Sequence, residues 1–426
     1  MTLAGLRVPR LNINQGVPEQ YKKTFLYLYL DIAWYGVLNG SILTFITVYA
    51  ARIGATAEQV GYLSAIPAVV AIFLAIPSGS WLQKGESNFR VVLSSIAHRF
   101  FYILLIFIPF LGSKSLQVDI IIYMILVMSL PGTALQVGFN NLFAETVPPA
   151  WRGHVAGARN ALFSLISILV LLLCGQILRL VIFPLNYQIV FSLGFIGAML
   201  SSLYLWLASK SHAANVLSPL APLTREDGPE EIPVNGKFAQ LALPGFKENT
   251  GFYRAMGVLF FLNLAIYLAS PVFPIYWVNH LHLTDQVISV GNGLFFVTNF
   301  IGSTQLSRLA GKYGNRYVIG AGALLMAFYP TLLGLSTGPA LYYVTSLGGG
   351  LASSLVGGLL INYLLEQTPE KRRPQYLAVY SIFLYAAVLI GSLVGPAIGT
   401  WIGLQTAMFV FAAIRLLAGI SVLALR

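Results

Sequence analysis

The sequence predicts an all-α membrane protein in which twelve transmembrane helices form two pseudo-symmetric six-helix bundles. Three observations predict this fold. Of the 426 residues, 57% are hydrophobic and only 9% are charged, whereas a soluble domain carries about 25% charged residues. Apolar stretches of membrane-spanning length recur along the whole chain. Sets of polar residues between these stretches occur twice, which indicates an internal duplication.

The apolar stretches are long enough to cross a bilayer, because about 20 apolar residues span its hydrocarbon core as a helix. Lipid offers no hydrogen-bond partner to an exposed backbone, so each stretch is expected to be helical. The expected helices cover residues 24–50, 58–82, 91–112, 118–143, 154–180, 186–208, 253–278, 286–307, 317–336, 339–365, 375–401 and 405–425. Prolines inside a span are expected to kink it, and kinks can serve gating. They are Pro67, Pro77, Pro131, Pro271, Pro274 and Pro396.

Residues 209–252 form a long polar stretch between the sixth and seventh expected helices. The stretch is rich in proline and carries an acidic patch at 226–231, a composition typical of a linker. We therefore expect three parts: an N-terminal six-helix bundle (1–208), a cytoplasmic linker (209–252) and a C-terminal six-helix bundle (253–426).

Basic residues predict the orientation, because Lys and Arg accumulate on the cytoplasmic side of membrane proteins. With the N-terminus inside, the loops on the opposite side hold only Arg52, Lys114 and Arg179. Arg99 and Arg415 fall within helices 3 and 12. We therefore expect an integral protein of a bacterial-type plasma (inner) membrane with both termini in the cytoplasm.

Several classes of function are disfavoured. The net charge of +11 is spread over short loops, so no nucleic-acid partner is expected. The single cysteine, Cys174, excludes an intrachain disulfide and a Cys-based zinc cluster, and neither a metal nor another cofactor is expected. The sequence contains no phosphate-binding loop and no His-Glu-x-x-His. We therefore expect no enzyme, and transport driven by a gradient rather than by ATP.

The duplication is carried by two sets of residues, most of them polar. One set recurs 221 positions later and the other 227 positions later. The first set is Asn141, Glu145, Pro148 and Arg152, matched by Asn362, Glu366, Pro369 and Arg373; the second is Tyr49, Glu58, Gln59 and Val60, matched by Tyr276, Asp285, Gln286 and Val287. Transporters built from repeats bind their substrate where the repeats meet.

This arrangement resembles the major facilitator superfamily over nearly the whole chain, 24–426. The signature loop of the family, between helices 2 and 3 and again between helices 8 and 9, is roughly Gly-x-Leu-x-Asp-Arg-x-Gly-Arg-Arg. Residues 307–316 resemble it, and 79–86 resemble it more weakly. Gln83 and Gly311 replace the acidic residue, which in the family helps to latch the cytoplasmic gate. The resemblance implies a secondary transporter that works by alternating access.

The loops after helices 4 and 10 also resemble the family, through its Glu-x6-Arg pattern. A carboxylate at a helix end can pair with a guanidinium across the following turn, which contributes about 0–1 kcal/mol at a wet site. We expect these residues and the basic residues of the second signature loop to act in gating rather than in substrate contact. The gating candidates are Glu145, Arg152, Lys312, Arg316, Glu366 and Arg373.

Asp31 is the one acidic residue placed inside an expected span and away from a loop, about 10 Å into helix 1. A charge there is costly unless it is paired, hydrated or protonated. Two interpretations remain open: a carboxylate that carries a proton or binds a cation, and a structural pair near the cytoplasmic gate. Arg159 on helix 5 is the expected partner, although it can instead snorkel to the surface. A pair with Arg159 would oppose proton uptake unless substrate displaces the arginine.

Uncharged polar residues are concentrated in helices 1, 4, 5, 7 and 8. Such residues either join helices or line a polar cavity. The cavity candidates are Tyr35, Asn39, Gln136, Asn140, Asn160, Asn263, Tyr267, Asn292 and Asn299. They suit an uncharged or amphipathic organic solute, because an obligate anion would need more central Arg or Lys. Arg99 is expected to snorkel, since helix 3 is peripheral in the family, and Arg415 has no assigned role.

We therefore expect a monomeric secondary transporter whose partners are a small organic solute and the lipid bilayer. Proton coupling through Asp31 is a hypothesis. Efflux of amphipathic compounds is favoured over uptake of a sugar-like solute. A non-transporting sensor and a lipid flippase with the same fold remain open alternatives.

Overall fold

The computed structural model describes residues 17–84, 87–216, 250–368 and 373–425. Within these residues, twelve helical spans are long and apolar enough to cross a membrane, and no strand occurs. The predicted all-α class and the number of spans are confirmed. Residues 217–249 of the expected linker lie outside the described ranges, and 209–216 continue the helix of the sixth span.

The first six spans begin at Glu19 and end at Val216. They comprise α1 (Glu19–Leu38), the π-helix η1 (Asn39–Leu43), α2 (Thr44–Arg52), α3 (Ala57–Gln83), α4 (Ser87–Phe100), α5 (Ile103–Phe107), the 3-10 helix η2 (Ile108–Phe110), α6 (Lys114–Thr146), α7 (Pro149–Leu180) and α8 (Leu185–Val216).

The last six spans begin at Thr250. They comprise α9 (Thr250–Ala269), α10 (Val272–Ile275), the π-helix η4 (Tyr276–His280), α11 (Asp285–Tyr313), α12 (Asn315–Gly334), α13 (Pro339–Gly357), α14 (Leu360–Glu366), α15 (Arg373–Ile402) and α16 (Leu404–Ala424).

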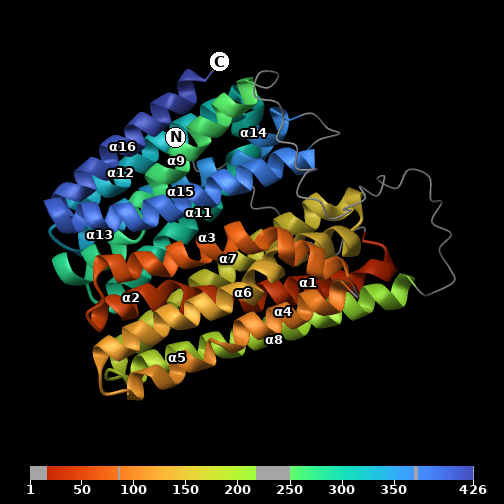
Figure 1. Ribbon diagram of the computed structural model, residues 1–426, viewed down its shortest axis with the longest axis horizontal. Helices are drawn as coiled ribbons and strands as arrows, with labels where there is room; N and C mark the ends of the chain where they lie inside the picture. The colour runs from red at the N-terminus through yellow and green to blue at the C-terminus, as the bar shows by residue number, and fades with distance from the viewer. Residues whose placement is uncertain (1–16, 85–86, 217–249, 369–372, 426) are drawn as a thin grey trace, which may run out of the picture.

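The helices form two groups that lie side by side, α1 to α8 (red to yellow-green) and α9 to α16 (green to blue) (Figure 1). In the first group, α1 packs against α7 and α8, and α6 packs against α3 and α4. In the second group, α12 packs against α13 and α16, and α9 packs against α15. The groups meet along two helix pairs, α7 with α11 and α3 with α15.

Irregular turns interrupt the first span of each group. The π-helix η1 separates α1 from α2, and η4 follows α10. Pro271 and Pro274 lie where α9 gives way to α10, because proline cannot donate the backbone hydrogen bond that continues a helix. Pro67, Pro77, Pro131 and Pro396 lie inside continuous helices, as does Pro330 of α12.

The two groups touch at one end of the molecule. On the facing sides of α7 and α11, Phe163 packs edge-on against Phe296, at 6.2 Å between ring centroids. Asn160 lies one helical turn before Phe163 on the same face of α7, and Ser303 lies two turns after Phe296 on the same face of α11. Both residues are exposed. In that direction these faces of α7 and α11 are therefore not packed against each other. We call the end that carries the α2–α3 and η4–α11 connections the closed end, and the opposite end the open end.

Candidate functional site

A cavity of about 840 Å³ lies in the first helix group and reaches the second. Its walls come from α1, α2, α3, α4, α6 and α7. Tyr267 of α9 and Tyr385 and Val388 of α15 complete it from the other group. The hydroxyl of Tyr385 donates a hydrogen bond to Oε1 of Gln136, at 2.8 Å, so the two groups are joined across the cavity.

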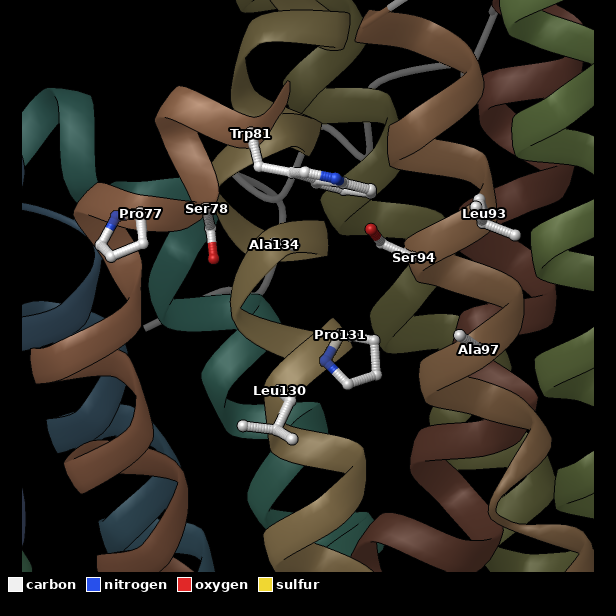
Figure 2. A pocket seen from close by; sticks show the side chains of 9 residues that line it. All are labelled: Pro77, Ser78, Trp81, Leu93, Ser94, Ala97, Leu130, Pro131 and Ala134. Carbon is white, nitrogen blue, oxygen red and sulfur yellow. The ribbon is translucent and has the colours of Figure 1, made fainter. Parts of the chain in front are cut away.

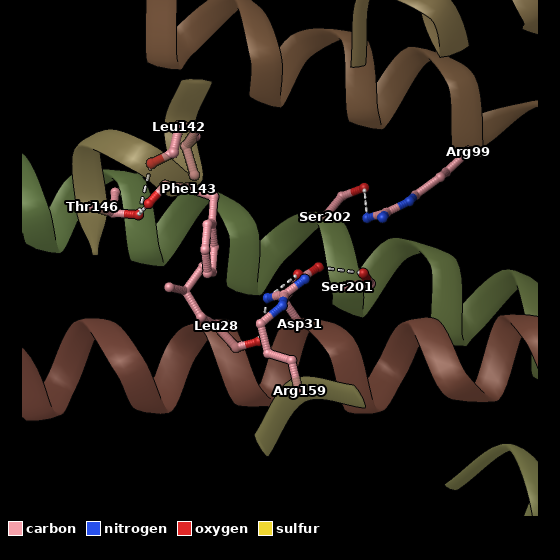
Figure 3. A network of polar contacts seen from close by, with 9 residues as sticks. All are labelled: Leu28, Asp31, Arg99, Leu142, Phe143, Thr146, Arg159, Ser201 and Ser202. Carbon is pink, nitrogen blue, oxygen red and sulfur yellow. Dashed lines mark hydrogen bonds and ion pairs between the residues drawn. The ribbon is translucent and has the colours of Figure 1, made fainter. Parts of the chain in front are cut away.

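Asp31 lies in the wall of this cavity and is 2% exposed. Its Oδ2 accepts a hydrogen bond from Nη1 of Arg159 at 3.1 Å, and its Oδ1 accepts one from the hydroxyl of Ser201 at 2.6 Å (Figure 3). Arg159 also donates to the carbonyl oxygen of Leu28 at 2.7 Å and lies over the ring of Phe139. Among the outcomes that the sequence allowed for Arg159, the structure shows the buried pair.

Arg99 lies in the same cavity, which corrects the expectation that it snorkels. The residue is 5% exposed, because α4 turns this face toward α8 rather than toward lipid. Its Nη1 donates to the hydroxyl of Ser202 at 3.0 Å (Figure 3). The Ser202 hydroxyl also lies 2.8 Å from the hydroxyl of Ser95. The guanidinium is 5.6 Å from the centre of the Tyr35 ring, a cation–π distance.

His98, the neighbour of Arg99, also lines the cavity. Its Nδ1 lies 2.8 Å from the carbonyl oxygen of Met128. Because a carbonyl only accepts, Nδ1 carries the hydrogen. The ring packs directly on Gly132, where any larger side chain would collide with it.

A second cavity of about 380 Å³ lies mainly in the other helix group. Its walls include Asn292, Tyr329 and Arg415. Thr47 and Ser64 line both cavities, so the two cavities are adjacent.

Arg415 is held entirely by backbone carbonyl oxygens. Nε donates to Ala265, Nη1 to Met326 and Nη2 to Ile266, at 3.1 to 3.3 Å. The Met326 carbonyl is free because Pro330, four residues later in α12, has no N–H to donate to it. The guanidinium of Arg415 therefore completes a helix that proline interrupts.

The cavity candidates from the sequence divide into two sets. Tyr35, Gln136, Asn140 and Tyr267 line the larger cavity, and Asn292 lines the smaller one. The remaining candidates line neither cavity. Asn39 donates to Ser167 of α7, Asn263 to the Leu259 carbonyl of its own helix and Asn299 to the Gly350 carbonyl of α13, whereas Asn160 is exposed.

The ion pair expected between Glu145 and Arg152 does not form. Nε of Arg152 donates to the carbonyl of Val147 at 3.1 Å, and Nη2 donates to that of Ala144 at 2.8 Å. The last carbonyls of α6 lack helical partners, and the guanidinium satisfies them. The side chain of Arg373, the equivalent residue of the second repeat, lies outside the described residues.

The other gating candidates make contacts within the second helix group. Glu366 accepts a hydrogen bond from Asn315 at 2.6 Å, which joins the end of α14 to the start of α12. Arg316 donates to the carbonyl of Leu425, just beyond α16. Lys312 lies over the ring of Tyr313, its neighbour. These residues therefore tie helices together at the open end without crossing between the groups.

Besides the Tyr385–Gln136 hydrogen bond across the cavity, polar contacts cross between the groups at the closed end, and the sequence analysis did not assign these a role. Nε of Arg52 donates to Oδ1 of Asp285 at 2.9 Å, and Nη2 donates to the Leu283 carbonyl. Glu58 accepts a hydrogen bond from Thr400 at 2.5 Å. Glu58 and Asp285 are the acidic residues of the second repeated set, so the duplication was the signal that could have revealed them.

Comparisons with known proteins agree with this architecture. The family model described as Major Facilitator Superfamily matches residues 255–426. In this second helix group the chain is similar to the major facilitator superfamily.

The similar proteins are distant from this chain in sequence. Multidrug resistance protein 2 of Bacillus subtilis (strain 168) is 24% identical over 178 residues, which cover 41% of this chain and 43% of that protein. The solved structure of a mutant of the nucleoside transporter NupG has a TM-score of 0.67 at 13% identity, covering 94% of this chain and 99% of the other. A bacterial homologue of the human lysosomal transporter Spinster, in an inward-facing and unoccupied conformation, has a TM-score of 0.64 at 14% identity, covering 96% and 99%.

A third hollow of about 400 Å³ lies on the outer side of the first helix group, between α3, α4 and α6. In Figure 2 the indole of Trp81 extends from α3 toward α4, above Ser94 and Pro131. Trp81, Leu93 and Leu130 are exposed, as expected for apolar side chains that face lipid on a membrane-spanning helix. This groove is apolar and separate from the central cavities.

Proposed function

We propose that the protein is a monomeric secondary active transporter that moves a small organic solute by alternating access. The observation that carries this proposal is a polar cavity shared by the two helix groups and shut at one end by contacts between them. Transporters with repeated halves expose such a site to each side in turn by rocking one half against the other. The moving bodies in this proposal are residues 1–208 and 253–426. A single chain supplies both walls of the cavity, which supports action as a monomer.

We also propose that both termini face the cytoplasm of a bacterial-type plasma membrane. The distribution of Lys and Arg supports this orientation. The closed end then faces the outside, and the structure corresponds to an inward-open state.

Asp31 is the proposed site of proton coupling. It is the only carboxylate among the residues that line either central cavity, and its partner Arg159 lies on a different helix. A solute that displaces Arg159 would leave a buried carboxylate that takes up a proton to avoid an unpaired charge.

The test is the Asp31→Asn variant in proteoliposomes. We expect it to lose pH-driven accumulation and to retain downhill exchange, because an amide fills the space without titrating. The matched control is Asp119→Asn in α6, a carboxylate outside the cavity. Accumulation by Asp31→Asn equal to that of the unmodified protein would rule out coupling through this residue.

The proposed direction is efflux of amphipathic compounds. Aromatic and polar side chains both line the cavity, which suits such compounds, and the name of the B. subtilis relative agrees with this class. Substrate screens in right-side-out and inverted vesicles test the direction. Accumulation of drug-like compounds by inverted vesicles supports efflux. Accumulation of sugar-like solutes by right-side-out vesicles would contradict efflux and support uptake instead.

A further inference from the structure

The larger cavity carries more positive than negative charge. Its titratable lining consists of the guanidinium groups of Arg99 and Arg159, the carboxylate of Asp31 and the imidazole of His98, besides tyrosine hydroxyls. Both oxygens of Asp31 are already engaged, by Arg159 and by Ser201. Among the described residues, no carboxylate lies within 4.0 Å of Arg99. The charge of Arg99 is therefore not neutralised by a direct ion pair.

Arg99 also leaves one edge of its guanidinium unused. Nη1 donates to Ser202, but Nε is buried without a partner, and no described residue accepts a hydrogen bond from Nη2. Nε and Nη2 share the edge with which an arginine binds a carboxylate through two parallel hydrogen bonds. In this same protein, that edge of Arg52 contacts Asp285 and the Leu283 carbonyl.

A buried guanidinium with free donors is unfavourable unless something accepts from it. The ring of Tyr35 compensates the charge in part, but it offers no acceptor in the plane of the guanidinium. An anionic group of a bound solute would supply the missing acceptors and the missing charge.

Arg415, the arginine of the smaller cavity, does not have this property. All three of its nitrogens donate to backbone carbonyls. Arg159 donates from Nη1 to the Leu28 carbonyl and to Asp31, so its charge is paired with a carboxylate. Of the three arginines that line the two cavities, Arg99 alone combines unused donor nitrogens with the lack of a carboxylate partner.

The rest of the cavity suits an apolar body attached to the anionic group. Its volume of about 840 Å³ accommodates a small organic molecule. The aromatic side chains in its walls are Tyr35, Tyr102, Phe139, Tyr267 and Tyr385. A ligand with one carboxylate and an aromatic or aliphatic body matches both the charge and the walls.

We propose that Arg99 binds the carboxylate of an amphipathic organic acid. Soluble acids of this class are then the substrates of the transporter, so this inference rests on the function proposed above. This assignment replaces the expectation from the sequence that an anion is disfavoured, because Arg99 and Arg159 lie inside the cavity rather than at the surface.

Isothermal titration of the full-length protein in neutral detergent tests the proposal with three probes of similar size: 2-naphthoate, 2-naphthamide and 2-naphthylmethylamine. We expect 2-naphthoate to bind at least about tenfold more tightly than the amide, because charge-assisted bidentate hydrogen bonds are stronger than neutral ones. The amine should bind more weakly than the amide. Equal affinity for acid and amide would overturn the proposal without any variant.

Three variants locate the effect. Arg99→Gln should abolish the preference for the acid over the amide, and Arg99→Lys should retain part of it. The control is Arg90→Gln, which removes the same charge from the same helix but lies over Trp81, outside the cavity. Preservation of the full preference in Arg99→Gln, or its loss in Arg90→Gln, would contradict a site at Arg99.

Two further measurements separate this inference from the proposed function. Counterflow of labelled 2-naphthoate in proteoliposomes tests transport: an Arg99-dependent preference without counterflow supports the anion site and refutes transport of these acids. Counterflow of 2-naphthamide as fast as that of 2-naphthoate supports transport and refutes the anion site.

Titration with added phosphatidylglycerol tests whether the anionic group belongs to a lipid. Displacement of 2-naphthoate by this lipid, dependent on Arg99, would overturn the assignment to soluble acids.

Discussion

Three charged side chains define the centre of the first helix group, and they differ in how fully each is partnered. Asp31 and Arg159 neutralise each other and are held further by Ser201 and the Leu28 carbonyl. Arg99 is equally buried but has only Ser202 and the Tyr35 ring. Buried charges are retained where they are paired or functional, so this difference separates the structural pair from the free cation.

Arg415 gives a prediction at the residue scale. It supplies the hydrogen bond that Pro330 cannot donate to Met326, so Arg415→Met leaves that carbonyl without a partner. In a Pro330→Ala background the N–H of residue 330 is restored, and Arg415→Met should cost less by about 1 kcal/mol. Thermal unfolding of the four proteins in detergent measures this coupling.

The control cycle pairs Arg415→Met with Pro396→Ala, a proline in α15 outside the contacts of Arg415. Its coupling energy should be close to zero. A coupling with Pro330→Ala no larger than this control would contradict the role assigned to Arg415.

The sequence predicts which residues are polar within the membrane, but not which way each points. Asp31 was identifiable because a lone carboxylate in a span is unusual. Arg99 was placed at the surface because its helix was taken as peripheral, and only the rotation of α4 toward α8 turns it inward. Asn39 shares a helix face with Asp31 and Tyr35, yet it starts the π-helix η1 and bonds to α7 instead.

At the scale of elements, close packing of α9 against α15 depends on glycine. A Cβ at Gly395 would collide with the carbonyl of Leu268, which is backbone and cannot rotate away. Gly395→Ala should therefore destabilise the protein by about 1–3 kcal/mol, as overpacking does. The control is Gly257→Ala in α9, where no atom lies near the added methyl group.

Gly257→Ala should be neutral or stabilising by about 0.5–1 kcal/mol, because alanine favours a helix over glycine. Unfolding of both variants by heat or denaturant in detergent provides the comparison. Equal stability of the two variants would refute the close contact at Gly395.

The helices themselves were predictable because hydrophobicity alone decides which segments enter a membrane. All twelve expected spans match an observed span within a few residues. The partners at their ends were not predictable, because the contacting residues are far apart in the chain. Arg52 and Asp285 are separated by 233 positions, and only the fold brings them together.

At the scale of the whole molecule, the second repeated set marks the two helix starts that shut the closed end. Thr56 caps α3 and Thr284 caps α11, and the acidic residues Glu58 and Asp285 lie in the first turns, where a negative charge is favourable. Each of these carboxylates also bonds to the opposite helix group. The duplication thus supplies one contact from each half.

The pair Arg52–Asp285 gives a prediction for the conformational equilibrium. Arg52→Gln removes a partly exposed ion pair worth about 1 kcal/mol, which corresponds to about a fivefold shift toward states open at this end. A cysteine introduced at Thr47, which lines the cavity, reports the shift. Its rate of reaction with a thiol reagent added from the closed end should increase. The control is Lys22→Gln, which breaks the exposed pair with Glu19 inside α1 and should leave accessibility unchanged.

The central claim is that two helix groups rock about a shared cavity. Distances between spin labels in lipid nanodiscs test it most directly. One labelled pair lies at the closed end (Tyr62 and Trp401) and one at the open end (Lys84 and Lys312), and all four side chains are exposed. The buried Cys174 is replaced so that only these sites are labelled. The account predicts two populations whose distances change in opposite directions, with substrate or pH altering their ratio. A single population at both ends under all conditions, or changes in the same direction at both ends, would contradict it.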